Sequence, residues 1–281
     1  MLDGFINLRK PANMTSHDAV NLVRRNLHIK KVGHGGTLDP AAVGVLPVAV
    51  GRATKFLEYI ADCDKTYRAE ILFGISTDSG DLDGEILNRV EDFEMPPLDE
   101  INSALKNFIG EIEQTPPKHS AIKINGRKAY DLARKNIDFE MPRRVVTIHR
   151  IKILSVDEKI LTLEIDCAKG TYIRSLAADI GESLKLPATL KFLTRERVGD
   201  FNLADACDFD SLKILPVEDC IDLKIFELPS RRIKAFCNGL PTNVEENDAR
   251  VKVYAAGKFL GVGKIRAGEL RSEKLFIDSS A

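Results

Sequence analysis

A run of alternating side chains at residues 65–73 constrains the fold of this chain more than any other feature. Tyr67, Ala69, Ile71 and Phe73 fall on one side of an extended backbone, and Thr66, Arg68, Glu70 and Leu72 fall on the other. A period of two is typical of a strand with one buried face. The pattern therefore predicts a strand within a larger sheet, with Tyr67 facing the core.

Further segments predict helices beside this sheet. Strands are expected at residues 4–8, 145–154 and 161–167, and helical spacing occurs within residues 20–27, 53–60, 98–108, 127–134 and 172–184. Thr15 or Ser16 is expected to cap the first of these helices, and Thr171 the last, because hydroxyl side chains accept from free backbone N–H groups. The first part of the chain is therefore predicted to be an α+β domain.

Beyond Pro229 the spacing changes to short strand-like runs. These are residues 251–254, 259–262 and 275–277, with Gly257, Gly261, Gly263 and Gly268 around them. A chain of 281 residues with 44% hydrophobic composition can build one substantial core and a small second domain. We expect a first domain at residues 1–228 and a β-rich domain at residues 229–281.

Charge is unevenly distributed along a chain whose net charge is only −1. Residues 78–100 carry nine acidic side chains opposed only by Arg89, whereas residues 118–150 carry nine Lys and Arg against three acidic side chains. The basic stretch lies in an excursion at about residues 115–145, between predicted elements. It indicates either a solvated charged face or a phosphate-binding surface, and composition alone favours neither.

Other patterns narrow the class of protein. Five cysteines without a C-x-x-C pair predict neither a disulfide nor a zinc site. We expect no leader, because the first five residues lack a basic stretch, and no membrane span, because no apolar run approaches the roughly 18 residues that a span needs. The acidic turn at residues 78–84 lacks the ligand spacing of a calcium loop and is expected to be solvated, and residues 261–263 lack the third glycine of a dinucleotide site. We therefore expect a cytoplasmic, soluble protein without a metal or cofactor.

The glycine-rich segment 33–47 combines tight-turn residues with reactive side chains. His34, Thr37 and Asp39 fall among seven residues that are too irregular for either a helix or a strand, so Asp39 is expected on a loop. By itself this pattern suggests a site without specifying a reaction. The alternative for Asp39 is a turn residue that bonds its own backbone before Pro40.

Five blocks of sequence follow one another over residues 1–201. They are Lys10-Pro11 with Thr15-Ser16-His17-Asp18; Gly33-His34-Gly35-Gly36-Thr37-Leu38-Asp39-Pro40 with Gly44-Val45-Leu46-Pro47; Lys65-Thr66-Tyr67; Pro116-Pro117 with Ser120-Ala121 and Lys123; and Gly170-Thr171-Tyr172-Ile173-Arg174-Ser175-Leu176. In this order and spacing they resemble the TruB family, the bacterial tRNA pseudouridine-55 synthases. Departures from the family pattern at Asn13, Val43 and residues 194–196 leave the residues of the implied catalytic set unchanged.

The resemblance implies a pseudouridine-synthase fold. This fold is a mixed, largely antiparallel sheet flanked by helices, here followed by a PUA-like RNA-binding domain. It also implies that Asp39 is the nucleophile, that Arg174 pairs with it, and that Tyr67 stacks on the target base. Because an aspartate with a pKa of about 3.9 is already ionised at neutral pH, Asp39 would need no separate base.

The resemblance further implies how transfer RNA is held. The target uridine would be extruded and His34 would fill its place. Further substrate contacts are implied at Thr37, Tyr172, Leu193, Lys10, Lys65, Lys118 and Lys123. The basic excursion would grip the T-arm and elbow of a tRNA. An isomerisation needs no cofactor, and we expect a monomer that acts without a protein partner.

Two other functions stay open at this stage. A guide-dependent pseudouridine synthase of the archaeal and eukaryotic kind would require partner proteins and a guide RNA. An RNA-binding factor that folds the tRNA elbow without chemistry would require only the basic excursion and the C-terminal domain.

Overall fold

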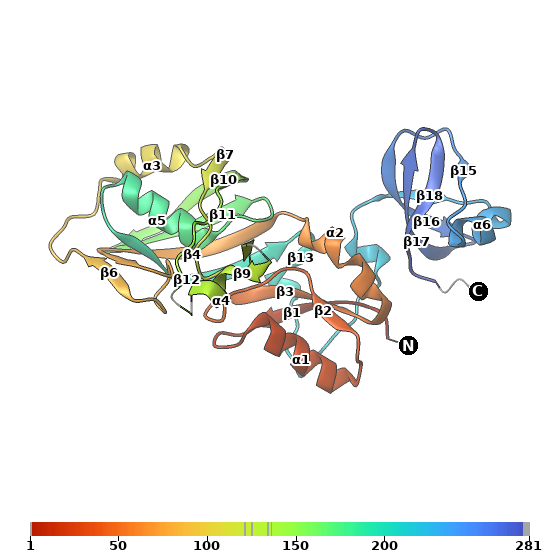
Figure 1. Cartoon of the computed structure of the whole chain (residues 1–281), viewed down its shortest axis with the longest axis horizontal. Coiled ribbons are helices and arrows are strands. Elements are labelled where there is room, and N and C mark those ends of the chain that lie inside the picture. Colours follow the sequence, from red (N-terminus) through yellow and green to blue (C-terminus); the bar gives the residue numbers. More distant parts are fainter. Residues whose placement is uncertain (1, 121, 125, 134, 136, 278–281) are drawn as a thin grey trace.

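The computed structural model describes residues 2–277 except residues 121, 125, 134 and 136. The first domain is built on a nine-stranded sheet (Figure 1). Its main path is β1 (Gly4–Lys10), β3 (Val43–Val50), β12 (Ala188–Val198), β4 (Lys65–Phe73), β11 (Ile160–Cys167), β10 (Arg144–Asp157) and β7 (Gly110–Gln114), with β2 (Val32–His34) beside β3 and β13 (Phe201–Asn202) beside β12. Among the described strands of this sheet only β12 and β3 pair in parallel, which confirms the predicted mixed, largely antiparallel sheet.

The alternating strand is confirmed as β4, and its inward side chains lie under two helices. The apolar side of β4 is buried and belongs to one core with α3 (Leu98–Lys106) and α5 (Ile173–Ser183). Helix α5 contributes its predicted apolar stripe to this core. Thr171 does not cap α5, because its hydroxyl donates instead to the carbonyl of Ala168, 3.0 Å away.

Helix α1 (Ser16–Leu27) covers the other end of the sheet, against β1 and β3. Thr15 is confirmed as its cap. The hydroxyl of Thr15 accepts from the backbone N–H of Asp18 at 3.0 Å, and the Asp18 carboxylate accepts from the N–H of Thr15 at 3.2 Å. This reciprocal capping box fixes the point where the chain enters the helix. The helical spacing at residues 53–60 corresponds to a 3₁₀ turn, Gly51–Phe56, followed by α2 (Leu57–Ala61).

Three stretches differ from the sequence prediction. Segment 33–47 is not loop throughout, because β2 ends at His34 and β3 begins at Val43. Strand β12 was not predicted; two register shifts in its pairing with β4 interrupt any simple alternation. The last strand is β18 (Glu269–Leu275) rather than residues 275–277, because the chain leaves the sheet after Leu275 to place Phe276 between the domains.

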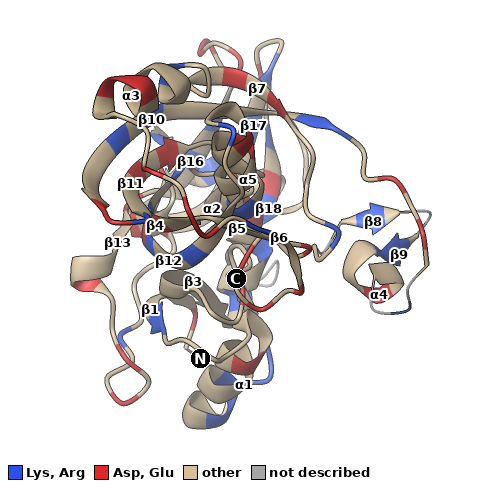
Figure 2. Cartoon of the chain, turned by 90° about the vertical axis from the view of Figure 1, so that its left-hand side faces the viewer, with Lys and Arg blue, Asp and Glu red and all other residues tan. Residues whose placement is uncertain are grey.

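Two small hairpins lie at the edge of the first domain. Strands β5 (Ile75–Thr77) and β6 (Ile86–Arg89) enclose the acidic turn. Strands β8 (Lys123–Ile124) and β9 (Arg127–Lys128), with α4 (Ala129–Ala133), form a lobe that stands apart from the sheet (Figure 2). The helix predicted at residues 127–134 thus starts two residues later than expected, and position 134 lies outside the described residues.

The C-terminal domain is β-rich, as predicted. Its five-stranded sheet has the order β14 (Lys224–Glu227), β16 (Ala249–Ala255), β17 (Lys258–Arg266), β18 and β15 (Thr242–Asn243), and α6 (Ile233–Cys237) packs beside it. The sheet therefore includes residues that precede position 229. In the part of the chain that the structure describes, every helix is too short or too polar to cross a membrane.

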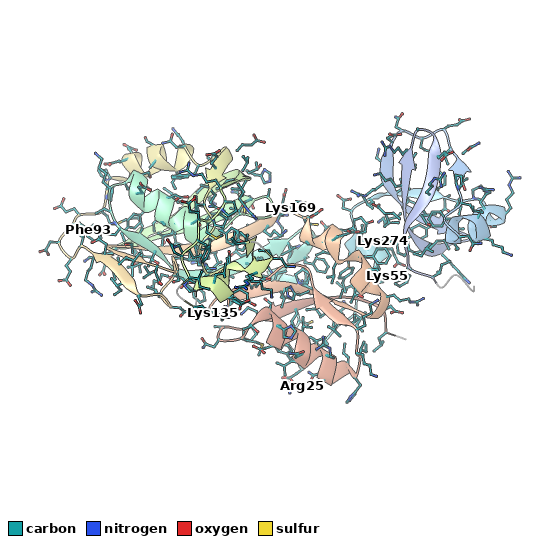
Figure 3. All side chains as sticks on the ribbon, viewed as in Figure 1. Arg25, Lys55, Phe93, Lys135, Lys169 and Lys274 are labelled. Carbon is teal, nitrogen blue, oxygen red and sulfur yellow. The ribbon has the colours of Figure 1, made fainter. Side chains whose placement is uncertain are left out.

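The two domains meet through aromatic side chains. Phe56 of the first domain lies 6.1 Å, centroid to centroid, from both Phe259 and Phe276 of the second. Around this contact, Lys55 donates to the carbonyl of Leu275 at 3.2 Å, and Lys274 pairs with a carboxylate of α2 at 3.2 Å (Figure 3). One continuous apolar cluster thus joins the domains.

Candidate active site

A cavity of about 300 Å³ opens at the junction of the Asp39 loop, the centre of the sheet and the start of α5. It brings together seven of the eleven side chains that the sequence singled out: Thr37, Asp39, Lys65, Tyr67, Tyr172, Arg174 and Leu193. Lys10, His34, Lys118 and Lys123 lie outside its lining. A wider groove of about 950 Å³ lies behind the loop and contains Lys10 but none of those seven.

The Asp39 loop is anchored from two sides. The hydroxyl of Ser16, in the first turn of α1, donates to the carbonyl of Leu38 at 3.0 Å and accepts from its N–H at 2.8 Å. The ammonium group of Lys10 is fully buried and donates to the carbonyl of Pro40 at 3.1 Å, as well as to two carbonyls of its own turn. Both contacts flank Asp39 directly, so its carboxylate has a fixed starting point.

Arg174 meets Asp39 across the cavity. Its Nε lies 3.0 Å from Oδ2 of Asp39, and the arginine side chain is almost entirely buried whereas the carboxylate is partly open to solvent. The rest of the guanidinium is held by the carbonyl of Ser79 at 3.0 Å, the carbonyl of His119 at 2.9 Å and, more loosely, a carboxylate oxygen of Asp81 at 3.5 Å. The direction of the guanidinium is thus determined from several elements.

The environment acts on the charge of Asp39 in opposite directions. Burial, the largest effect, raises the pKa of Asp39 above its usual value, and the Arg174 guanidinium lowers it. Asp81 raises this pKa further, and Lys10 lowers it. The result is an aspartate with a raised pKa in a cavity, paired with a fixed cation, which is a common arrangement for a reactive carboxylate.

Aromatic and aliphatic side chains form the other walls. Tyr67, on β4, and Leu193, on the neighbouring β12, are each 9% exposed and line the cavity. The backbone of Tyr172 is held from both sides by the amide of Gln114, which donates to its carbonyl at 3.0 Å and accepts from its N–H at 2.8 Å. Burial raises the pKa of the Tyr67 hydroxyl, so this ring is neutral at physiological pH.

The remaining predicted residues occupy different surroundings. Lys65 is buried and donates to the carbonyls of Ala61 and Cys63 at the cavity edge. His34 lies beside the loop, where its Nδ1 accepts from the N–H of Gly36 at 3.4 Å, and burial lowers its pKa. Lys118 and Lys123 are exposed in the projecting lobe and its base, as expected for groups that meet a large partner.

Two residues of the site were missed by the sequence prediction. Asp81 belongs to the turn that we predicted to be solvated, yet its side chain is only 18% exposed and it faces Arg174. Arg195 lies two positions after Leu193 on β12 and also lines the cavity. Spacing could not identify Asp81, because the contact joins residues that are far apart in sequence. The strand period linking Leu193 to Arg195 would have placed both on one face.

Solved structures share this architecture over both domains. In the crystal structure of a Cbf5-Nop10-Gar1 complex, the matching chain gives a TM-score of 0.76 at 24% identity, covering 99% of this chain and 86% of that one. A structure of an H/ACA RNP bound to a substrate RNA containing 2'-deoxyuridine gives 0.74 at 23% identity, with 98% and 86% covered. At these identities the likeness concerns the fold alone.

The family of the chain follows from its sequence matches. The model of the TruB family pseudouridylate synthase N-terminal domain matches residues 24–173, more than half of the chain, which places the chain among the pseudouridylate synthases. The chain belongs to the TruB family. A second family model, for the C-terminal part of pseudouridine synthase II TruB, matches residues 226–276.

Proteins named tRNA pseudouridine synthase B are similar to this chain over nearly its whole length. The tRNA pseudouridine synthase B of Alkaliphilus oremlandii is 41% identical over 282 residues, covering 94% of each chain. That of Carboxydothermus hydrogenoformans is 44% identical over 285 residues, covering 98% of this chain and 99% of its own.

Proposed function

We propose that this chain converts uridine 55 in the T-loop of transfer RNA to pseudouridine. The observation that carries the proposal is the ion pair between Asp39 and Arg174 at the edge of a cavity of about 300 Å³. A cavity of this size suits a single base rather than a helix. The name tRNA pseudouridine synthase B, borne by relatives that match nearly the whole chain, supports transfer RNA as the substrate.

The reaction exchanges one glycosidic bond for another. The bond between N1 of uracil and C1' of the ribose breaks and leaves its electron pair on the ring. The ring turns within the cavity, a bond forms between C5 and C1', and the hydrogen at C5 leaves as a proton while N1 gains one. Substrate and product have the same atoms, so no second reactant is consumed. Catalysis must therefore come from the protein, as a nucleophile, a rigid pocket and charge stabilisation.

In this proposal Asp39 is the nucleophile, and Arg174 keeps its carboxylate oriented and anionic. Tyr67 stacks on the extruded base and assists removal of the C5 proton, while Thr37, Tyr172, Leu193 and Lys65 line the pocket around it. His34, at the rim of the site, fills the gap that the base leaves in the RNA. Lys10 lies behind the loop, so its contribution is to hold that loop.

The proposed contacts with RNA extend beyond the cavity. The excursion at about residues 115–145, with Lys118 and Lys123, grips the T-arm and elbow, and residues 229–281 add a PUA-like surface. Because β14 pairs into the C-terminal sheet, the second domain includes part of the segment before residue 229. We propose that the chain acts as a monomer without a protein partner or guide RNA, in the cytoplasm.

Replacing the nucleophile tests this function. The purified chain alone, incubated with an unmodified tRNA transcript, should form pseudouridine at position 55, and Asp39→Asn should abolish the reaction because an amide is not a nucleophile here. The affinity of the variant for tRNA should stay within a few-fold of the unaltered chain. The product position is mapped by chemical modification and primer extension.

Each alternative gives a different result in this experiment. Turnover by Asp39→Asn would contradict the assignment of Asp39 as the nucleophile. An unaltered chain that is inactive until a guide RNA is added would favour the guide-dependent class. Binding without any product would favour a tRNA-folding factor.

A further inference from the structure

Arg195 is a fully buried cation at the edge of the active site. It is 1% exposed, and it donates hydrogen bonds to three backbone carbonyl oxygens. In the described part of the chain no salt bridge to Arg195 is found. Burying an arginine without a counter-charge costs free energy, so its presence calls for a compensating role.

The three acceptors lie on both sides of the nucleophile loop. Nη2 donates to Gly36 at 3.1 Å and Nη1 to Thr37 at 3.2 Å, just before Asp39, while Nε donates to Val45 at 2.8 Å, just after the loop. One rigid guanidinium therefore joins the beginning and the end of the segment that presents the carboxylate. Three of the five N–H groups of an arginine are used in this way.

The backbone at Arg195 is also in close contact with the loop. Gly44 pairs with Arg195 where β3 and β12 run parallel, and a Cβ atom at Gly44 would lie 2.2 Å from the carbonyl oxygen of Arg195. The φ of Gly44 is +109°, a conformation that favours glycine. This glycine allows the end of the loop to reach the guanidinium.

The same guanidinium faces the other groups of the site. Tyr67 is paired with Arg195 across β4 and β12, and both side chains line the cavity. The positive charge lowers the pKa of His34, after the larger effect of burial, and that of Lys65 in the same order. Arg195 thus lies close to the Asp39 loop, to Tyr67 and to His34.

We propose that Arg195 is a positioning residue for pseudouridine formation, which fixes the Asp39 loop against Tyr67 by bonding carbonyls on both sides of the carboxylate. The inference rests on the proposed function of the site. Arg195 acts through geometry, so a positive charge alone at this position does not replace it. A lysine carries its three N–H groups on one atom, so it cannot span the carbonyls at both ends of the loop as the wider planar guanidinium does.

Arg195→Lys and Arg195→Met test this role. The rate is measured in single turnover as tritium released from C5-labelled uridine in a tRNA transcript, with tRNA affinity measured separately. Both variants should lose about 100-fold in rate, as expected when a reactive group is displaced by about 1 Å, and should keep tRNA affinity within about three-fold. A wild-type rate in Arg195→Lys, or a rate loss that follows lost affinity, would overturn the inference.

Arg197→Met provides the matched control. Arg197 lies on the same strand, but its guanidinium pairs with Asp166 at 3.6 Å and bonds the hydroxyl of Thr66 at 2.9 Å, outside the cavity. Its rate should stay within about three-fold of the unaltered chain. A loss equal to that of the Arg195 variants would show that any arginine removed from this strand has the same effect, and would also overturn the inference.

A second readout checks that the guanidinium lies close enough to His34 to act on its charge. His34 is followed by NMR titration, and the charges that lower its pKa are those of Arg195 and, to a smaller extent, His17. Removing the cation in Arg195→Met should raise the pKa of His34, and Arg197→Met should leave it unchanged. An unchanged His34 pKa in Arg195→Met contradicts the placement of the guanidinium.

If the unaltered chain itself is inactive on tRNA, the proposed function fails, whereas an active chain with an active Arg195→Lys variant refutes only the positioning role.

Discussion

Arg174 is shared between two carboxylates, and this sharing affects the charge of Asp39, the proposed nucleophile. Its guanidinium lies 3.0 Å from Asp39 and 3.5 Å from Asp81. Burial raises the pKa of Asp39, and the negative charge of Asp81 raises it as well. Because only the ionised carboxylate is nucleophilic, the rate should fall as pH drops through this pKa, and the fall should occur above the ordinary value of 3.8.

Asp81→Asn tests this coupling. The amide keeps an oxygen that can accept from the Ser79 hydroxyl and the Asp83 N–H, as the carboxylate does now at 2.5 and 3.2 Å, but it removes one negative charge. The pKa of Asp39 should therefore fall, and the acid limb of the single-turnover rate should move to lower pH. At neutral pH the rate should drop about 10-fold, because Arg174 loses one of the groups that orient it.

The control for this variant is Asp83→Asn. Asp83 is an exposed carboxylate of the same turn, so the pH profile of this variant should match that of the unaltered chain. An acid limb that moves to higher pH in Asp81→Asn would contradict the electrostatic coupling.

At the scale of elements, the alternating pattern identified β4, whereas two strands beside the Asp39 loop and the cavity, β3 and β12, were missed because their patterns are irregular. Strand β4 alternates because one side contacts the core formed with α3 and α5. Strand β3 is buried at seven of its eight positions, so its apolar run carries no period of two. Strand β12 has two register shifts against β4, which break its alternation. Such irregularities depend on the neighbouring strand and are not visible in one segment.

The active site shows the same limit. Asp39, Tyr67 and Arg174 were predicted only because the blocks that contain them resemble one family, and the structure places all three around one cavity. Asp81 has no distinctive local pattern, and the spacing that links Arg195 to Leu193 is informative only once β12 is recognised as a strand. Their place in the site depends on contacts with Arg174 and with the Asp39 loop, which only the folded sheet creates.

The projecting lobe and its flanking segments concentrate basic side chains, with nine Lys and Arg against three acidic side chains over residues 118–150. We expect about four RNA phosphates to be engaged, so tRNA affinity should fall roughly 50-fold between 50 and 200 mM salt. Replacing both Lys118 and Lys123 by Gln should reduce the slope of log affinity against log salt by the amount that corresponds to about two phosphate contacts. Filter binding over a salt series measures this slope.

Lys159→Gln is the comparison for the salt series. Lys159 lies at the turn between β10 and β11 and donates to the carbonyl of Glu91 at 2.8 Å, in the acidic region, so the slope should stay unchanged. A flat salt response in the unaltered chain would refute an electrostatic grip by this lobe.

At the scale of the whole molecule, the interface between the domains resembles a protein core. Phe56, Phe259 and Phe276 are in mutual contact, with ring centroids 5.6 to 6.1 Å apart, and Arg52 lies 4.9 Å from the centre of the Phe276 ring. At the edge, the hydroxyl of Tyr59 donates to a carboxylate of β18 at 3.2 Å. Interfaces between domains that move are usually more polar, so this contact should fix the C-terminal domain relative to the cavity.

This rigid contact predicts that the two domains unfold together. Differential scanning calorimetry of the unaltered chain should give one transition with equal calorimetric and van't Hoff enthalpies. Phe259→Ala removes a ring that is 6% exposed, at a cost of about 3–5 kcal/mol, and should separate the unfolding into two transitions because the lost contacts join the domains. Phe236→Ala removes an equally large ring from within the C-terminal core alone, where it is fully buried, and should lower the melting temperature while keeping a single transition. If Phe259→Ala still unfolds in one step, the aromatic contact is not what couples the domains, and the fixed distance between the C-terminal domain and the Asp39 cavity must depend on the polar contacts of Lys55 and Lys274 instead.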